Sequence, residues 1–259
     1  MKKAKVIMKV VIIIFMVLIV ALVAIYINHR IQLNKEEELK TPLGKIVEVD
    51  GHKMSVYIEG NGDKTIVFMS GGGTCSPILD FKSLYSLLSD DYRIVVIEKF
   101  GYGFSDVVDK ERNIDSILED TRTALAEADI QGPYVLCPHS MSGIEALYWA
   151  QQYPEEVEAI IGLDMATPIS YKNWTDKEVA KRIKTMKMLR KFMIHKIINI
   201  GPGKCDCFIQ DEIEQQKLLK SRNAFNVCYI NEAKEVLKNA DIVDAAGSID
   251  CPTLLFTSN

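Results

Sequence analysis

A serine stands where a strand-like stretch of this chain gives way to a helical one. The segment VLCPHSMSGIEALYWAQQYP, residues 135–154, places Ser140 directly before the helical pattern. A serine hydroxyl is a weak nucleophile, so it requires a base that takes its proton and N–H donors for the oxyanion. A sharp strand-to-helix turn exposes the hydroxyl and turns the next N–H, that of Met141, toward the developing charge. We therefore predict that Ser140 is a nucleophile rather than an ordinary turn residue, and that Met141 is an oxyanion donor.

The elements that must position Ser140 alternate between apolar strands and helical patterns. Residues 45–60 are predicted to form a hairpin with Asp50-Gly51 at its turn. Further strands are predicted at 65–70, 93–98, 134–138, 157–164 and 253–257, and helices at 77–88, 113–128 and 143–153. Such alternation is typical of a mostly parallel sheet that helices cover on both faces. Residues 166–250 break the pattern, because they are mostly helical and rich in charge.

A run of three glycines, residues 71–73, follows the strand predicted at 65–70. Glycines after a strand are also found in dinucleotide-binding loops. That motif requires the spacing G-x-G-x-x-G, and residue 76 is a serine here. The glycine run is therefore weak evidence for a nucleotide site.

Four short motifs, in chain order, resemble those of the alpha/beta-hydrolase superfamily. The elbow of that superfamily is G-x-S-x-G, its glycine-rich segment is D-x-x-G-x-G-x-S, and an earlier strand ends in His-Gly. The corresponding segments here are MSGG (69–72), EKFGYGFSD (98–106), PHSMSG (138–143) and GLD (162–164). The departures from the family pattern are Ser70 for His, Glu98 for Asp, and Pro138 and Ser142 for the two elbow glycines.

The resemblance implies an alpha/beta-hydrolase fold, with a mostly parallel central sheet, helices on both faces and a helical cap insertion. It implies a serine hydrolase that cleaves an ester, thioester or amide through an acyl intermediate on Ser140. It also implies that the N–H of Gly72 is the second oxyanion donor, and it requires neither a cofactor nor a metal.

The resemblance also implies a triad in the order Ser, acid, His. None of the four histidines stands where the base belongs: His29 and His52 precede Ser140, His139 adjoins it, and His195 lies in the helical insertion. The ring of His139 should point away from Ser140 at such a turn. No general base is therefore recognisable within these residues.

Asp164 is a candidate for the acid, because some family members place it at the end of this strand. The alternative is a structural residue at a strand end. The sequence stops at Asn259, directly after the strand that follows the cap. We therefore expect the chain to be C-terminally incomplete, with the last strand and helix missing, an exposed apolar edge at 253–257, and no activity of its own.

The N-terminus carries an apolar run, Val10 to Ile27, of 18 residues without charge. At about 1.5 Å per residue it spans a bilayer core, and it exceeds the usual signal-peptide core of about 7–15 residues. Four lysines precede the run, whereas the two basic residues after it, Arg30 and Lys35, are followed by the three glutamates at 36–38. The positive-inside rule predicts a single-pass anchor in the cell membrane, a cytoplasmic N-terminus and an extracytoplasmic domain. A cleaved signal peptide is the alternative.

These patterns predict five regions in the chain. They are a basic segment with a transmembrane anchor (1–28), a linker (29–43), the hydrolase core (44–165), the helical cap (166–250) and a return to the core (251–259). The cap carries a cluster of lysines and arginines, which we interpret as a solvated helix face or, alternatively, a surface for anionic lipid. Met186, Met188 and Met193 either pack under the cap or line an apolar pocket for acyl chains.

Six cysteines accompany this exported placement. An oxidising compartment permits disulfides, yet Cys137 lies in an apolar strand, and the Cys205-Asp-Cys207 motif lacks the second half of a zinc site. We therefore expect free thiols.

Composition narrows the class of partner. The 259 residues are 48% hydrophobic, which suits one sizeable domain with a buried core. The net charge of −4 is small and does not suggest nucleic acid or any other strongly charged partner. The expected partners are a small-molecule or lipid-like ester or amide substrate, and the membrane through the N-terminal helix. Two functions are compatible with these features: a membrane-anchored serine hydrolase, and a non-catalytic, degenerate hydrolase-fold binding module.

Overall fold

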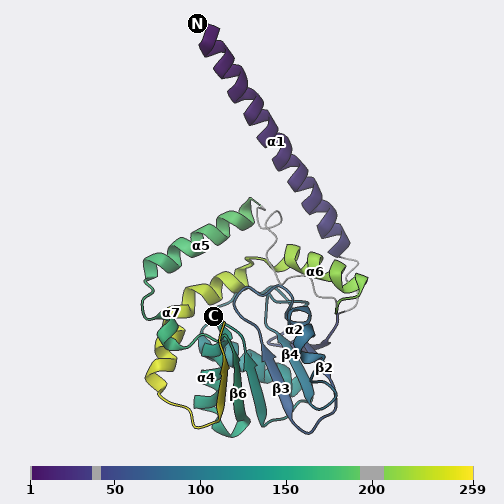
Figure 1. Cartoon of the computed structure of the whole chain (residues 1–259), viewed down its shortest axis with the longest axis vertical. Coiled ribbons are helices and arrows are strands. Elements are labelled where there is room, and N and C mark those ends of the chain that lie inside the picture. Colours follow the sequence, from purple (N-terminus) through teal and green to yellow (C-terminus); the bar gives the residue numbers. More distant parts are fainter. Residues whose placement is uncertain (1, 37–41, 193–206, 259) are drawn as a thin grey trace. The chain divides into compact units, whose positions relative to one another are not determined.

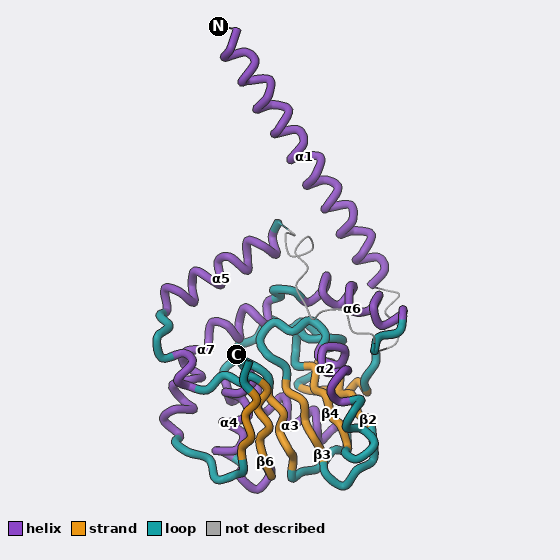
Figure 2. The backbone as a smooth tube through the Cα atoms, in the orientation of Figure 1, coloured by secondary structure: helices purple, strands orange, loops and turns teal. Residues whose placement is uncertain are grey.

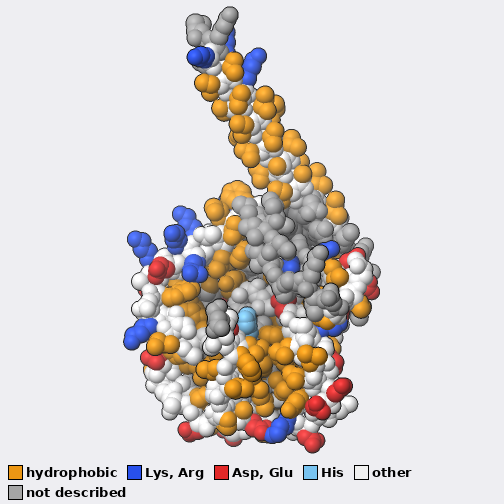
Figure 3. Space-filling model, viewed as in Figure 1, with side chains coloured by type: hydrophobic (Ala, Val, Ile, Leu, Met, Phe, Trp, Pro, Cys, Tyr) orange, Lys and Arg blue, Asp and Glu red, His pale blue; other side chains and the backbone are white. Residues whose placement is uncertain are grey.

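The computed structural model describes residues 2–36, 42–192 and 207–258. These fall into two compact units, residues 1–40 and 41–259. The first unit is one helix, α1 (Lys2–Glu36), and hydrophobic side chains cover most of its length (Figure 3). Its segment Lys5–Ile27 has a mean hydropathy of 3.5 and is long enough to cross a membrane. This length and composition suit either a membrane anchor or a signal sequence.

The second unit is built on a seven-stranded sheet in the order β1-β2-β4-β3-β5-β6-β7 (Figure 1). Its strands are β1 (Lys45–Val49), β2 (His52–Glu59), β3 (Thr65–Met69), β4 (Arg93–Glu98), β5 (Tyr134–Pro138), β6 (Val157–Leu163) and β7 (Thr253–Phe256). Strand β2 pairs antiparallel with β1 and β4, and the remaining neighbours are parallel. The predicted mostly parallel sheet is therefore confirmed, and its carboxyl edge collects the ends of β3, β5 and β6.

The predicted hairpin is also confirmed. Asp50 and Gly51 join β1 to β2 with φ values of +51° and +71°. Positive φ at both central residues is the requirement of a type I′ turn, which suits the twist of the two strands.

Helices cover both faces of the sheet (Figure 2). Successive side chains of a strand point to opposite faces, so the apolar residues of the buried strands give each face a surface on which helices pack. On one face, α2 (Pro77–Tyr85) packs against Ile66, Phe68 and Val96. On the other, α3 (Ile114–Glu127) and α4 (Ser142–Gln152) pack against Val67 and Val95. The side chain of Asn113 accepts a hydrogen bond from the Ser116 N–H at 2.9 Å, so Asn113 caps the N-terminus of α3.

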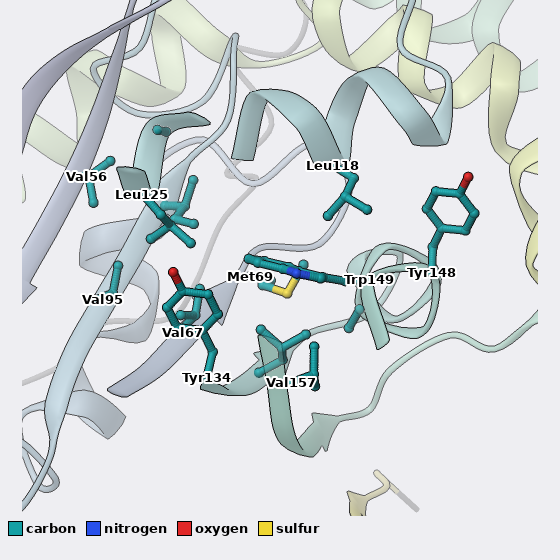
Figure 4. Packing of buried hydrophobic residues seen from close by; sticks show 14 of the residues in the cluster. Val56, Val67, Met69, Val95, Leu118, Leu125, Tyr134, Tyr148, Trp149 and Val157 are labelled. Carbon is teal, nitrogen blue, oxygen red and sulfur yellow. The ribbon is translucent and has the colours of Figure 1, made fainter. Parts of the chain in front are cut away.

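Trp149 anchors α4 to the sheet (Figure 4). Its side chain is fully buried, its ring lies 5.5 Å from that of Tyr134 on β5, and its Nε1 donates to Glu156 at 2.7 Å. Because α4 begins at Ser142, two residues after Ser140, this packing fixes the helix that orients the candidate nucleophile.

The proposed cap contains one short 3₁₀ turn, η2 (Pro168–Tyr171), and three described helices, α5 (Asp176–Lys191), α6 (Gln210–Asn223) and α7 (Val227–Ala246). Another 3₁₀ turn, η1 (Pro154–Glu156), precedes β6. Helices α5 and α6 lie beyond the carboxyl ends of the parallel strands (Figure 1). Met193, which is expected to pack under the cap or to line an apolar pocket, lies outside the described residues.

Strand β7 forms one edge of the sheet, as predicted for residues 253–257. It pairs with β6 on one side, and all four of its residues are exposed. Leu254, Leu255 and Phe256 are 52–56% exposed. This edge is therefore apolar.

The cysteines divide into two groups. Cys75, Cys137, Cys228 and Cys251 are free, as expected. Cys207 is disulfide-bonded, which corrects the expectation of a free thiol at this position. Cys205 lies outside the described residues. An oxidising compartment favours such a bond.

Candidate functional site

Ser140 occupies the turn between β5 and α4 in a left-handed backbone conformation, with φ of +52°. This conformation is uncommon for a residue other than glycine, so the surrounding bonds must hold it. The Ser140 carbonyl accepts hydrogen bonds from the N–H of Ala166 at 2.7 Å and of Gly143 at 3.0 Å. The turn is therefore strained and held from two sides, as a nucleophile elbow requires.

Ser142 braces this turn. Its hydroxyl oxygen lies 2.7 Å from the Met69 carbonyl and 2.9 Å from the His139 carbonyl, and it accepts from the His139 N–H at 3.0 Å. Ser142 thus replaces the second glycine of the family motif with a buried polar tie to β3. The close approach itself falls to Gly143, because a Cβ there would overlap with the Ala166 carbonyl.

Pro138 is accommodated because the ladder resumes one residue later. Pro138 is the last residue of β5, and the N–H of His139 donates to the Met69 carbonyl at 3.0 Å. The missing proline N–H therefore leaves the β3–β5 pairing intact at the turn.

Gly72 lies against the side chain of Met141. A Cβ placed on Gly72 would lie 2.8 Å from the Met141 Cε and 3.0 Å from the ring of Tyr229. Within the described part of the chain, neither the Gly72 N–H nor the Met141 N–H has a hydrogen-bond acceptor. Both groups are thus available to an oxygen atom of a bound substrate.

The glycine loop, residues 71–73, is fixed by a contact that the sequence did not reveal. The Gly73 N–H donates to the Tyr102 hydroxyl at 3.1 Å, and that hydroxyl donates to Glu232 Oε2 at 2.6 Å. Burial, and next the Glu232 carboxylate, raise the pKa of Tyr102 well above its ordinary value. Tyr102 therefore stays a neutral donor that joins the loop to α7.

Glu232 belongs to a buried network of charges. Lys99 Nζ lies 2.6 Å from Glu145 and 3.5 Å from Glu232, and Arg112 lies 3.7 Å from Glu232. All four side chains are at most 6% exposed. Burial lowers the pKa of Lys99, but the two carboxylates outweigh burial, and its pKa is raised. These four residues come together only in the folded chain, so no sequence motif predicts the network.

Asp164 lies at the end of β6 and is tied to the chain beyond β7. Its carboxylate accepts from the Ser258 hydroxyl at 2.6 Å and from the Ser258 N–H at 3.4 Å, which lower its pKa. The residue is exposed, and its φ is +46°. Asp164 thus shares the carboxyl edge of the sheet with Ser140, and its described hydrogen bonds are to other groups.

The described histidine side chains are engaged elsewhere. The His139 ring packs edge-on against Phe81, with centroids 6.4 Å apart, and His52 packs edge-on against Phe100. Burial lowers the pKa of His139. His195 lies outside the described residues, as does the side chain of His29. Among the described residues, the Ser140 hydroxyl has no hydrogen-bonded base.

Two cavities flank the glycine loop. The first, of about 170 Å³, is lined by Ser140, Met141 and Gly72. Side chains of the proposed cap complete its wall, and they include Tyr171, Trp174, Val179, Met186, Tyr229 and Val236. The wall of the second cavity, of about 420 Å³, includes His139, Asp80 and Lys220. Burial raises the pKa of Asp80 to about 7. Ser140 and His139 therefore open into different cavities, as the elbow geometry predicted.

Comparison with known proteins agrees with this architecture. A family model for the alpha/beta hydrolase fold matches residues 64–190. Uncharacterized protein YbdG from Bacillus subtilis is 44% identical over 177 residues, which are 68% of this chain and 54% of that protein. A cis-3-alkyl-4-alkyloxetan-2-one decarboxylase from Xanthomonas campestris is 29% identical over 119 residues, 43% of this chain and 39% of that one. The chain thus spans about half the length, or less, of these curated relatives.

Solved structures share the fold at low identity. A putative epoxide hydrolase from Pseudomonas aeruginosa superposes with a TM-score of 0.65 at 14% identity, covering 85% of this chain and 80% of that one. An enol-lactonase from Burkholderia xenovorans gives 0.58 at 15% identity, with coverages of 82% and 80%. The chain belongs to the alpha/beta-hydrolase superfamily.

Proposed function

We propose that this protein is a serine hydrolase that cleaves an ester, thioester or amide through an acyl intermediate on Ser140. The observation that carries the proposal is the left-handed turn at Ser140, φ +52°, between β5 and α4. The unpaired N–H groups of Met141 and Gly72, within the described residues, support it as oxyanion donors. A serine at this position argues against the family members that need aspartate there, such as epoxide hydrolases and dehalogenases.

In the proposed reaction, the Ser140 oxygen attacks the carbonyl carbon while a base takes the hydroxyl proton. The oxyanion accepts hydrogen bonds from Met141 and Gly72, and its collapse breaks the bond to the alcohol, thiol or amine, which leaves with that proton. Water then attacks the acyl-serine, releases the acid and restores the hydroxyl. The proposal assigns no residue to the base, and Asp164 stays a candidate for the acid.

The similarity to an enol-lactonase agrees with this reaction class, since a lactone is a cyclic ester. At 15% identity that similarity supports the fold alone. The reaction class therefore depends on Ser140 and its donors.

A fluorophosphonate probe tests the proposal on the whole protein. We expect covalent labelling of Ser140, absent in Ser140→Ala and retained in Ser83→Ala, which removes an exposed hydroxyl of α2. No labelling of the unmodified protein, or labelling that survives Ser140→Ala, would contradict it.

We further propose that α1 anchors the domain outside the cell membrane, with the N-terminus in the cytoplasm. The apolar segment Lys5–Ile27 and the lysines before its core support this placement. Protease added to intact cells should digest the domain. Protection that disappears only after permeabilisation would place the domain inside.

A non-catalytic binding module is the second candidate. The observation in its favour is the Ser140 hydroxyl, which has no hydrogen-bonded base among the described residues. Ester turnover that Ser140→Ala abolishes would exclude this alternative.

A further inference from the structure

We propose that the Ser140 cavity accepts a short acyl group that ends in an anion, and that Arg182 of α5 binds this anion. This inference rests on the proposed function, because it names the substrate class for the same site. A half-ester or half-thioester of a small dicarboxylic acid is the simplest such substrate.

The size of the cavity limits the acyl group. Its volume is about 170 Å³. An apolar cavity of about 150 Å³ holds one benzene molecule. The part of the acyl group that lies inside this cavity therefore has roughly the bulk of a benzene ring.

The chemistry of the walls indicates the charge. Aromatic and aliphatic side chains from η2, α5 and α7 make up most of the described wall, and Arg182 is the one charged side chain among its described residues. Pockets usually combine an apolar lining with a few polar groups that fix the orientation of the ligand. A single guanidinium beside an apolar cavity selects a carboxylate or a similar anion.

Arg182 is oriented by an aromatic ring, and its one described carboxylate neighbour, Glu178, interacts with it electrostatically without a direct bond. Its Cζ lies 4.2 Å from the centroid of the Trp174 ring, so the indole supports one face of the guanidinium. Within the described residues, Arg182 forms neither a hydrogen bond nor an ion pair. An arginine held flat on an aromatic ring presents its N–H groups in a fork that matches a carboxylate.

Arg182 stands at the outer end of the Ser140 cavity. A second cavity of about 430 Å³ shares Trp174, Arg182 and Met186 with it. Arg182 is itself exposed. The anionic end of the acyl group would thus remain near solvent, where charge costs less, while its apolar part lies between Arg182 and Ser140.

The alternative is that Arg182 belongs only to the solvated basic face of α5. Lys and Arg side chains gather over this helix (Figure 3). The exposed residues Lys181, Lys184 and Lys187 do not line the Ser140 cavity. Lys184→Ala is therefore a matched control, since it removes one positive charge from the same helix.

Two 4-nitrophenyl esters of similar shape test the proposal: the butyrate, and the monoester of succinate, which has a carboxylate where butyrate has its methyl group. We expect the unmodified protein to prefer the succinate ester. Arg182→Ala should lower the ratio of kcat/KM values, succinate over butyrate, by about 10- to 100-fold, as expected when a charged hydrogen bond is lost. Lys184→Ala should leave the ratio within about twofold, because an exposed charge contributes little.

A preference for butyrate, or an Arg182→Ala ratio equal to that of the unmodified protein, would overturn the inference. Binding of methyl hydrogen succinate and of methyl butyrate to Ser140→Ala, followed by calorimetry, tests it without turnover. We expect tighter binding of the anionic ester, lost in the Ser140→Ala, Arg182→Ala double variant. Equal affinity for the two esters would overturn it. Absence of hydrolysis together with preferential binding of the anion would refute the proposed function alone.

Discussion

The hydroxyl of Tyr102 lies 2.6 Å from the carboxylate of Glu232 and accepts a hydrogen bond from the Gly73 N–H at 3.1 Å. Tyr102 follows β4, whereas Glu232 belongs to α7 of the proposed cap. One buried phenol therefore links the cap to the loop that carries Gly72. The position of that loop decides whether the Gly72 N–H can reach an oxyanion, so this link should affect the proposed chemistry as well as stability.

Tyr102→Phe should lower both the rate of the proposed reaction and the stability of the protein. Loss of the hydroxyl leaves the buried Gly73 N–H without its acceptor, and Glu232 Oε2 keeps only the more distant Lys99, which costs about 1–3 kcal/mol of unfolding free energy. A looser loop should lower kcat for ester hydrolysis by about tenfold and change KM less, since an oxyanion donor acts in the transition state. Urea unfolding and steady-state kinetics measure the two effects. A destabilised variant with an unchanged kcat would show that Tyr102 has a structural role only.

Gly103→Ala should be strongly destabilising. Gly103 has φ of +48°, and a Cβ there would overlap with the buried carboxylate of Glu98. We expect a loss of about 3 kcal/mol or more in unfolding free energy. Gly51→Ala is the control, because Gly51 has a similar positive φ of +71° but nothing within 4 Å of a Cβ. The unfolding free energy of Gly51→Ala should fall by about 1 kcal/mol. Equal losses in the two variants would refute the steric part of the prediction.

Ser142→Ala tests the brace of the elbow. The hydroxyl is fully buried and bridges the turn to Met69. The Met69 and His139 groups keep their backbone hydrogen bonds, so removing the hydroxyl should lower the unfolding free energy by about 0.5–1.5 kcal/mol. Ser83→Ala, on the exposed face of α2, should change it by at most about 0.5 kcal/mol. Thermal and urea unfolding of both variants measure the difference. An unchanged unfolding free energy in Ser142→Ala would show that the turn at Ser140 does not depend on the Ser142 hydroxyl.

Glu98 should make stability depend on pH. Burial raises its pKa from 4.5 to about 7, against a hydrogen bond from the Phe104 N–H at 2.8 Å. The folded state then holds a proton that the unfolded state releases, so stability is highest below about pH 4.5 and declines as the pH rises through 7. This single group accounts for roughly 3 kcal/mol across that range.

Glu98→Gln should remove this part of the pH dependence, because the amide keeps an acceptor for Phe104 and does not titrate. Urea unfolding from pH 5 to 8 compares the slopes of the two proteins. Parallel slopes would show that the Glu98 pKa is not raised. Burial also raises the pKa of Asp80 to about 7. The unfolding free energy of both proteins should therefore keep a smaller dependence on pH.

Much of the fold followed from local patterns. The alternation of apolar strands and helical segments predicted the parallel sheet, and Asp50-Gly51 predicted the hairpin turn. Those features depend on neighbours in the sequence, since a strand or turn is specified within a few residues. The expected free thiol at Cys207 was wrong, because no pattern at that site distinguishes a free thiol from a bonded one.

The sequence by itself determined where Ser140 lies, between a strand and a helix, and that small residues follow it. Only the tertiary structure decided that Ser142 ties this turn to β3, that Tyr102 joins the glycine loop to α7, and that Arg182 faces the Ser140 cavity. The reason is distance along the chain. Tyr102 and Glu232 are 130 residues apart, and contacts of that separation arise only when sheet and cap helices pack together.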